Sequence, residues 1–171
     1  IPWSVRLSGD LNIPVLQQAL DAIVAHHEVL HTNYLAENGN PIQVVAEPKL
    51  VELPIIDLQQ YGQAEQETQI QKLLLQESQQ PFDLSSDMML RGCLLQLAPQ
   101  EHILLLVMHH IAADGWSIGI LWKQLTQLYQ AFLEGRPNPL AKLPIQHADY
   151  AAWQREWLSG EILDQQLSYW Q

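Results

Sequence analysis

The sequence is poor in cysteine, in basic residues and in long apolar runs. Its single cysteine, Cys93, has no partner for an internal disulfide and stands among apolar residues, so we expect a small core residue in the reducing cytoplasm. Eight Lys and Arg residues against 19 Asp and Glu residues give a formal net charge of −11, which argues against nucleic acid and anionic membranes as partners. No apolar run is long enough to span a membrane, and no signal peptide opens the chain.

Several patterns that mark binding sites are also missing. The sequence has no internal repeat, no phosphate-binding loop and no zinc-ligand spacing. His102, His109, His110 and His147 form no recognised ligand pattern, so we expect no metal site. The chain begins without methionine, and we interpret it as a piece of a longer protein.

The composition and the patterning are those of one compact domain. Of the 171 residues, 47% are hydrophobic and 16% are charged, as in globular proteins. Residues 103–108 form an unbroken apolar run, typical of a strand buried on both faces. Periodicity and turn signals predict strands over 3–11, 51–56 and 88–97, a hairpin turning at Asn38-Gly39, helices over about 13–30, 63–79 and 117–132, and an aromatic helical segment within 145–171.

The stretch 107–117 is the strongest candidate for a functional site. It joins the apolar strand to a helix for which Ser117 is the expected N-cap, and such loops carry functional groups in open α/β folds. His109 and His110 stand at the strand end, and Asp114-Gly115 follows as a turn pair. Neutral imidazole can take and return a proton near pH 7, and Asp114 could accept a hydrogen bond that fixes the loop. The spacing alone favours the alternative in which both histidines are structural core residues and Asp114-Gly115 is a simple turn.

The order and spacing of the residues over 109–117 indicate a family more specifically than the residue types alone do. His109-His110-x-x-x-Asp114-Gly115 resembles the signature of the condensation domains of nonribosomal peptide synthetases, relatives of chloramphenicol acetyltransferase. The following Trp116-Ser117 sharpens the resemblance, because epimerisation domains share the core and usually continue differently. Wax-ester and diacylglycerol acyltransferases share the core too. Three further strings are similar to family motifs in the same order: His-His-Glu-Val-Leu-His-Thr over 26–32, Pro-Phe-Asp-Leu over 81–84, and the string over 147–154.

The resemblance implies an α/β (α+β) half-domain of the chloramphenicol acetyltransferase type, a mixed sheet with flanking helices, with residues 1–171 as the N-terminal half of a condensation domain. The implied reaction is attack by the α-amine of an acceptor aminoacyl thioester on the carbonyl of a donor acyl or peptidyl thioester. Both substrates would arrive on the 4'-phosphopantetheine arms of donor and acceptor carrier domains, beside an adenylation domain. No cofactor would be bound directly.

The resemblance also implies roles for individual residues. His110 is the implied catalytic residue, acting either as a general base or as the group that positions the amine and stabilises the tetrahedral intermediate. Asp114 would hold the loop through an arginine, and Gly115 would let the backbone approach the reacting group. The implied supporting residues are His109, Trp116, His31, His26 and Trp153.

Two departures from the family pattern leave alternatives open. Both arginines of the second motif are histidines here, His26 and His31, which puts the Asp–Arg pairing in doubt. The first family motif and the entire C-terminal half are absent, so we expect the 171-residue chain to be inactive alone. The leading hypothesis is a condensation domain that uses an L-configured donor. The alternatives are an epimerisation domain and an inactive condensation-like module that recruits carriers.

Overall fold

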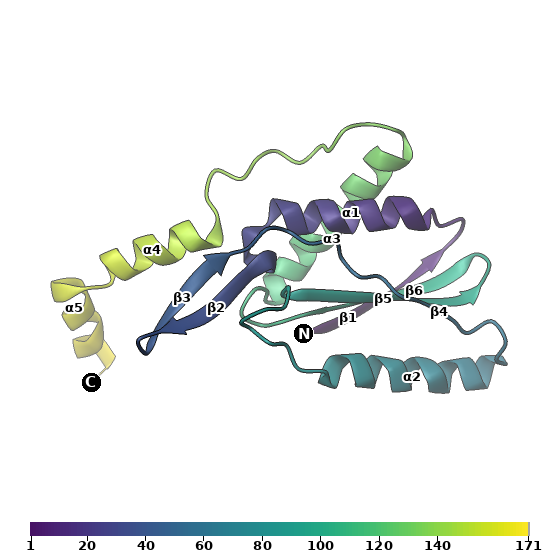
Figure 1. Ribbon diagram of the computed structural model, residues 1–171, viewed down its shortest axis with the longest axis horizontal. Helices are drawn as coiled ribbons and strands as arrows, with labels where there is room; N and C mark the ends of the chain where they lie inside the picture. The colour runs from purple at the N-terminus through teal and green to yellow at the C-terminus, as the bar shows by residue number, and fades with distance from the viewer. Residues whose placement is uncertain (171) are drawn as a thin grey trace.

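The computed structural model describes residues 1–170, and its body is a four-stranded mixed sheet with helices on both faces (Figure 1). The strands lie in the order β1, β6, β5, β4. β6 pairs antiparallel with β1 and with β5, whereas β4 runs parallel to β5. The predicted mixed sheet is therefore confirmed. The bounds are β1 (Pro2–Ser8), β4 (Ile55–Asp57), β5 (Leu90–Ala98) and β6 (Glu101–Met108).

β6 leads into the candidate site, and it is buried on both faces. The even-numbered side chains of the run 103–108 belong to the core cluster with α1 (Ile13–His26) and α3 (Gly115–Leu133). The odd-numbered ones belong to a second cluster that α2 (Gln63–Gln79) covers. Because side chains alternate between the two faces of a strand, a sheet between two helical layers needs apolar residues at every position.

α1 begins where the sequence predicts and ends earlier. Asn12 caps it by accepting a hydrogen bond from the Val15 N–H at 3.1 Å. The helix ends at His26, because His27 has extended backbone angles and a short 3₁₀ turn, η1 (Glu28–His31), follows. The expected continuation to residue 30 is therefore wrong, although the 3₁₀ turn still buries Leu30.

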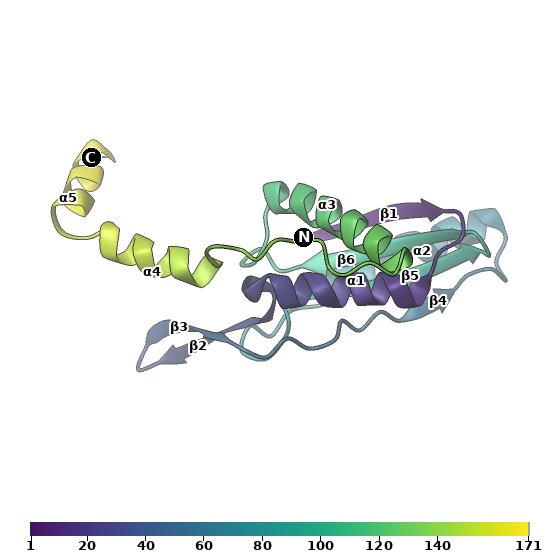
Figure 2. The ribbon, with the colours of Figure 1, turned by 90° about the horizontal axis from the view of Figure 1, so that it is seen from above.

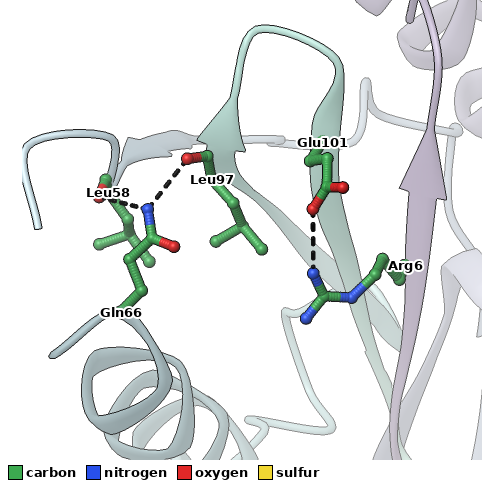
Figure 3. A network of polar contacts seen from close by, with 5 residues as sticks. All are labelled: Arg6, Leu58, Gln66, Leu97 and Glu101. Atoms are coloured by element: carbon green, nitrogen blue, oxygen red, sulfur yellow. Dashed lines mark hydrogen bonds and ion pairs between the residues drawn. The ribbon is translucent and has the colours of Figure 1, made fainter. Parts of the chain in front are cut away.

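α2 has the predicted bounds and does more than cover the surface. It lies on the sheet face opposite α1 and α3 (Figure 1). The Gln66 side-chain amide donates to the backbone carbonyls of Leu58 at 3.0 Å and Leu97 at 2.9 Å (Figure 3). A polar residue of a helix that looked merely solvated therefore ties the helix to the edge of the sheet.

The predicted hairpin forms a separate two-stranded ribbon of β2 (Thr32–Glu37) and β3 (Asn40–Val45). Asn38 and Gly39 form its two-residue turn with φ values of 52° and 81°. Both residues lie in the left-handed region, as the type I′ turn favoured by Asn-Gly requires.

The last two helices extend away from the body. α4 (His147–Trp157) and α5 (Gly160–Trp170) follow the irregular segment 134–146, and neither has a buried residue (Figure 1, Figure 2). α4 meets the body at its first turn, where Gln146 donates to the His26 carbonyl at 3.1 Å. Over residues 1–170, no helix combines the length and the apolar character needed to cross a membrane.

Candidate functional site

His109 anchors the loop between β6 and α3. Its N–H donates to the Met89 carbonyl at 3.1 Å, and its own carbonyl accepts from the Ala112 N–H at 3.0 Å. The His109 Nδ1 accepts a hydrogen bond from the Ile111 N–H at 3.0 Å. An accepting Nδ1 carries no proton, so the ring proton of neutral His109 is on Nε2. The first histidine of the pair therefore organises the loop.

The His109 ring is also held by an aromatic contact that the sequence did not reveal. The Phe82 ring meets it edge-on, with 5.7 Å between ring centroids. The Arg91 guanidinium carbon lies 3.8 Å from the Phe82 centroid, within cation–π range. Arg91 itself donates to the carbonyls of Gln80 at 2.6 Å and Pro81 at 2.9 Å. The Pro-Phe-Asp-Leu string thus supports the first histidine, although no local pattern in the sequence could have shown this.

His110, the next residue, has the opposite environment. Its side chain is exposed, and its imidazole makes no hydrogen bond with any residue in the described range 1–170. Hydrogen bonds from Ser117 lower the pKa of Asp114, and the charge of His110 adds to this effect. The imidazole is therefore accessible to a substrate and lies within electrostatic range of an acid.

Asp114, and not Ser117 as expected, is the N-cap of α3. Its Oδ1 accepts from the Ser117 N–H at 2.8 Å and from the Ser117 hydroxyl at 2.7 Å, and its own N–H donates to that hydroxyl at 3.2 Å. This reciprocal capping box places the serine three residues inside the helix. The hydrogen bonds from Ser117 hold the pKa of Asp114 below its usual range. The aspartate fixes the loop without an arginine.

Gly115 and Trp116 leave one side of the loop open. Gly115 is the first residue of α3, and its φ lies outside the left-handed region, so the expected turn does not depend on glycine-only angles. A Cβ added at Gly115 would meet nothing within 4 Å. The Trp116 side chain is 83% exposed. Both positions are therefore open to solvent in this structure.

A cavity of about 160 Å³ lies beside the loop. Its wall comes from the end of β6 and the loop, from the first turns of α3, and from the segment 27–30. The lining residues are His27, Val29, Leu30, Met108, Ala112, Ala113, Ser117, Ile120 and Leu121.

The comparisons with known proteins identify the family. The family model of the condensation domain matches residues 1–171. The chain belongs to the condensation domain family. One of the linear gramicidin synthase proteins of Brevibacillus parabrevis is 45% identical over 170 residues, which cover 99% of this chain and 3% of that protein. This condensation-domain chain is therefore similar to a small part of a much longer peptide synthase.

Solved structures agree with the family. The X-domain from teicoplanin biosynthesis, solved in complex with OxyB, matches with a TM-score of 0.89 and 30% identity over 99% of this chain and 37% of that chain. The epimerisation domain from the third module of tyrocidine synthetase B matches with a TM-score of 0.82 and 24% identity, over 39% of that chain, and shows the shared fold. This chain spans less than half the length of either structure.

Neither of the second-motif histidines, His26 and His31, makes a hydrogen bond with Asp114 among residues 1–170. His31 is 5% exposed, and its Nδ1 lies 2.6 Å from the Ala46 carbonyl. A carbonyl only accepts, so Nδ1 carries the proton, while the buried Nε2 has no hydrogen-bond partner among residues 1–170. His26 is half-buried, and burial, followed by the charge of His27, lowers its pKa. The carboxylate of Asp114 takes its hydrogen bonds from α3 instead.

Trp153 lies on α4 and is not part of the cavity wall. It is 51% exposed and stacks on Trp157, with centroids 5.7 Å apart and planes at 13°. The structure therefore groups the loop residues His109, His110 and Asp114 together and leaves Trp153 on a separate helix.

Cys93 is the single cysteine of the chain and lies outside the histidine loop. Cys93 is buried in β5, as predicted for a core residue, and burial raises the pKa of its thiol to about 11. The thiol is therefore protonated at neutral pH. Within residues 1–170, no three His, Cys, Asp or Glu side chains come together in a way that could hold a metal ion.

Proposed function

We propose that this chain supplies one wall and the catalytic histidine of a condensation domain that joins two carrier-bound thioesters by an amide bond. The observation that carries the proposal is the exposed imidazole of His110, which lies in the family signature at the end of a doubly buried strand. The neighbouring loop is held by His109 and by the Asp114–Ser117 capping box. A rigid scaffold that presents one accessible imidazole suits proton transfer or the orientation of an amine.

In the proposed reaction the neutral α-amine of the acceptor attacks the donor carbonyl. A C–N bond forms, the C–S bond of the donor thioester breaks, and the amine loses a proton that ends on the released thiolate. His110 carries that proton, or it orients the amine and stabilises the tetrahedral intermediate. An α-amine with a pKa of about 7.7–8.0 is partly neutral at pH 7, so orientation contributes as well as deprotonation.

The proposal includes the partners that such a reaction needs. Donor and acceptor carrier domains present the thioesters on 4'-phosphopantetheine arms, a neighbouring adenylation domain loads an amino acid, and a C-terminal half faces His110. The similarity to a synthase many times longer than this chain supports this setting.

Replacement of His110 in a full-length condensation domain containing this chain tests the assignment. His110→Ala should lower the rate of amide formation between loaded carriers by about 10²–10⁴, the usual contribution of a proton-transfer group. The denaturation midpoint should not change, because the side chain is exposed. His109→Ala is the matched control and should lower that midpoint, because it removes the contacts with Ile111 and Phe82. A folded His110→Ala protein that condenses at the unmodified rate would overturn the proposal.

A second candidate function is a condensation fold that serves as a binding platform. The similarity to an X-domain that was solved in complex with OxyB favours it, together with the two histidines in place of second-motif arginines. The condensation assay, combined with a measurement of carrier binding, separates the two functions. Retained binding of loaded carriers without any amide product, in the unmodified domain, would identify the platform.

A further inference from the structure

The cavity beside the loop has an almost wholly apolar wall. Seven of its lining residues are hydrophobic, and the polar ones are His27 and Ser117. Ile120, on the rim, is 43% exposed, so the cavity is reached from the surface beside the first turns of α3. An apolar space open to solvent is costly to leave to water and favourable to fill with an apolar group.

Both polar side chains in the wall already have partners. The His27 Nε2 lies 2.6 Å from the Gln124 Oε1, and the Ser117 hydroxyl is engaged with Asp114 as donor and as acceptor. A polar ligand group would therefore have to break one of these contacts, whereas a hydrocarbon group would not.

The position and size of the cavity match the substrates of the proposed reaction. Ala112 lines it and is two residues from His110, which limits the distance between their Cα atoms to about 7 Å. The volume of about 160 Å³ is close to that of an apolar protein cavity, about 150 Å³, that accommodates benzene. A side chain as large as that of leucine or phenylalanine therefore fits in the cavity, close to the proposed catalytic residue His110.

We propose that this cavity binds the apolar side chain of an aminoacyl thioester and selects that substrate by size. The inference rests on the proposed condensation function and extends it to the substrate class. Either the donor or the acceptor can present such a side chain, because both are amino-acid thioesters.

Val29 is the position from which to test the cavity. It lines the wall from η1, outside the histidine loop, so a substitution there leaves the loop residues unchanged. Val29→Phe should fill the cavity, and Val29→Ala should enlarge it. Leu75→Phe is the matched control, because it adds the same ring on α2 at a side chain that is 58% exposed.

The first measurement is binding, which does not depend on catalysis. Non-transferable leucyl- and alanyl-pantetheine amides are titrated into the full-length domain. The leucyl compound should bind about 10-fold or more tightly, since one methylene group in an apolar pocket discriminates by about 10–200-fold. Val29→Phe should remove this preference, Val29→Ala should shift it from the leucyl toward the larger phenylalanyl amide, and Leu75→Phe should leave it unchanged. Equal affinities in the unmodified domain, or a preference that neither Val29 variant alters, would overturn the inference.

The second measurement assigns the side chain to one substrate. The ratio of kcat/KM for leucyl over alanyl thioesters is measured with the donor varied and then with the acceptor varied. Val29→Phe should lower the ratio in one series only, by about 10-fold or more, and that series identifies the occupant. If the unmodified domain makes no amide while the leucyl amide still binds preferentially, the proposed function fails and the apolar site stands.

Discussion

The two adjacent histidines of the loop have different surroundings, although they are neighbours in the sequence. The His109 ring is half-buried against Phe82 and accepts a backbone hydrogen bond, so a proton placed on Nδ1 would break the contact that shapes the loop. The exposed His110 ring has no such constraint. The division explains how one short motif can combine a fixed backbone with a side chain free to meet a substrate.

His31 gives a prediction at the scale of one residue. His31→Arg restores the residue usual in the family, but the site is 5% exposed and the ring's Nδ1 contacts only a carbonyl. A permanent charge at such a position without an acid beside it costs about 3–5 kcal/mol. We expect a lower denaturation midpoint for His31→Arg and a smaller loss for the neutral control His31→Gln. A His31→Arg domain as stable as the unmodified one would mean that the guanidinium reaches a carboxylate or solvent.

At the scale of the elements, β5 contains a glycine, Gly92, at a position where neighbouring groups lie close to the backbone. The segment 46–54 passes against the sheet here, and the Leu94 N–H donates to the Pro54 carbonyl at 2.9 Å. A Cβ added at Gly92 would lie 2.9 Å from a Leu106 methyl carbon and 3.3 Å from the Leu105 carbonyl oxygen. The missing side chain therefore leaves room for the Leu106 side chain of the neighbouring strand β6.

Gly92→Ala should accordingly destabilise the domain by about 1–3 kcal/mol, the usual cost of overpacking. Gly119→Ala is the control. Gly119 lies in α3 with nothing within 4 Å of an added Cβ, and alanine there should stabilise the helix by about 0.5–1 kcal/mol. Urea denaturation of the two variants checks both signs. A Gly92→Ala domain with an unchanged midpoint would show that Leu106 moves aside without cost.

At the scale of the whole molecule, α4 and α5 expose an aromatic surface that the body does not cover. The exposed fractions are 51% for Trp153, 47% for Trp157, 81% for Tyr169 and 82% for Trp170. Apolar surface gathered on two outlying helices is typical of a place where another part of an assembly packs. We therefore expect the 171-residue chain on its own to self-associate and to bind a hydrophobic dye, without forming condensation product.

Sedimentation, dye fluorescence and a condensation assay check this expectation. Trp153→Gln combined with Trp157→Gln should reduce dye binding, because it breaks up the stacked pair. Trp116→Gln changes one exposed tryptophan outside α4 and should reduce dye binding less. A monodisperse, dye-silent chain that condenses loaded carriers would show that residues 1–171 contain a complete site.

The sequence by itself determined the elements whose signals are local. The bounds of α2, the Asn38-Gly39 turn and the position of the histidine loop between a buried strand and a helix all follow from periodicity, turn chemistry and apolar runs within a few residues. The signal for the N-cap of α3 is also local. Asp114 and Ser117 are both residue types that cap helices, so the sequence indicated Ser117, whereas Asp114 is the cap and Ser117 lies three residues later in the helix.

Only the tertiary structure decided which histidines are buried and where the cavity lies. The Arg91–Phe82–His109 contacts and the contact between His31 and Ala46 join residues from different elements. Burial depends on how the elements pack, so the residue type alone does not show whether a histidine is exposed or buried. The cavity beside the loop exists because the segment 27–30, the end of β6, the loop and the first turns of α3 meet there, and no residue pattern along the chain encodes an unfilled space.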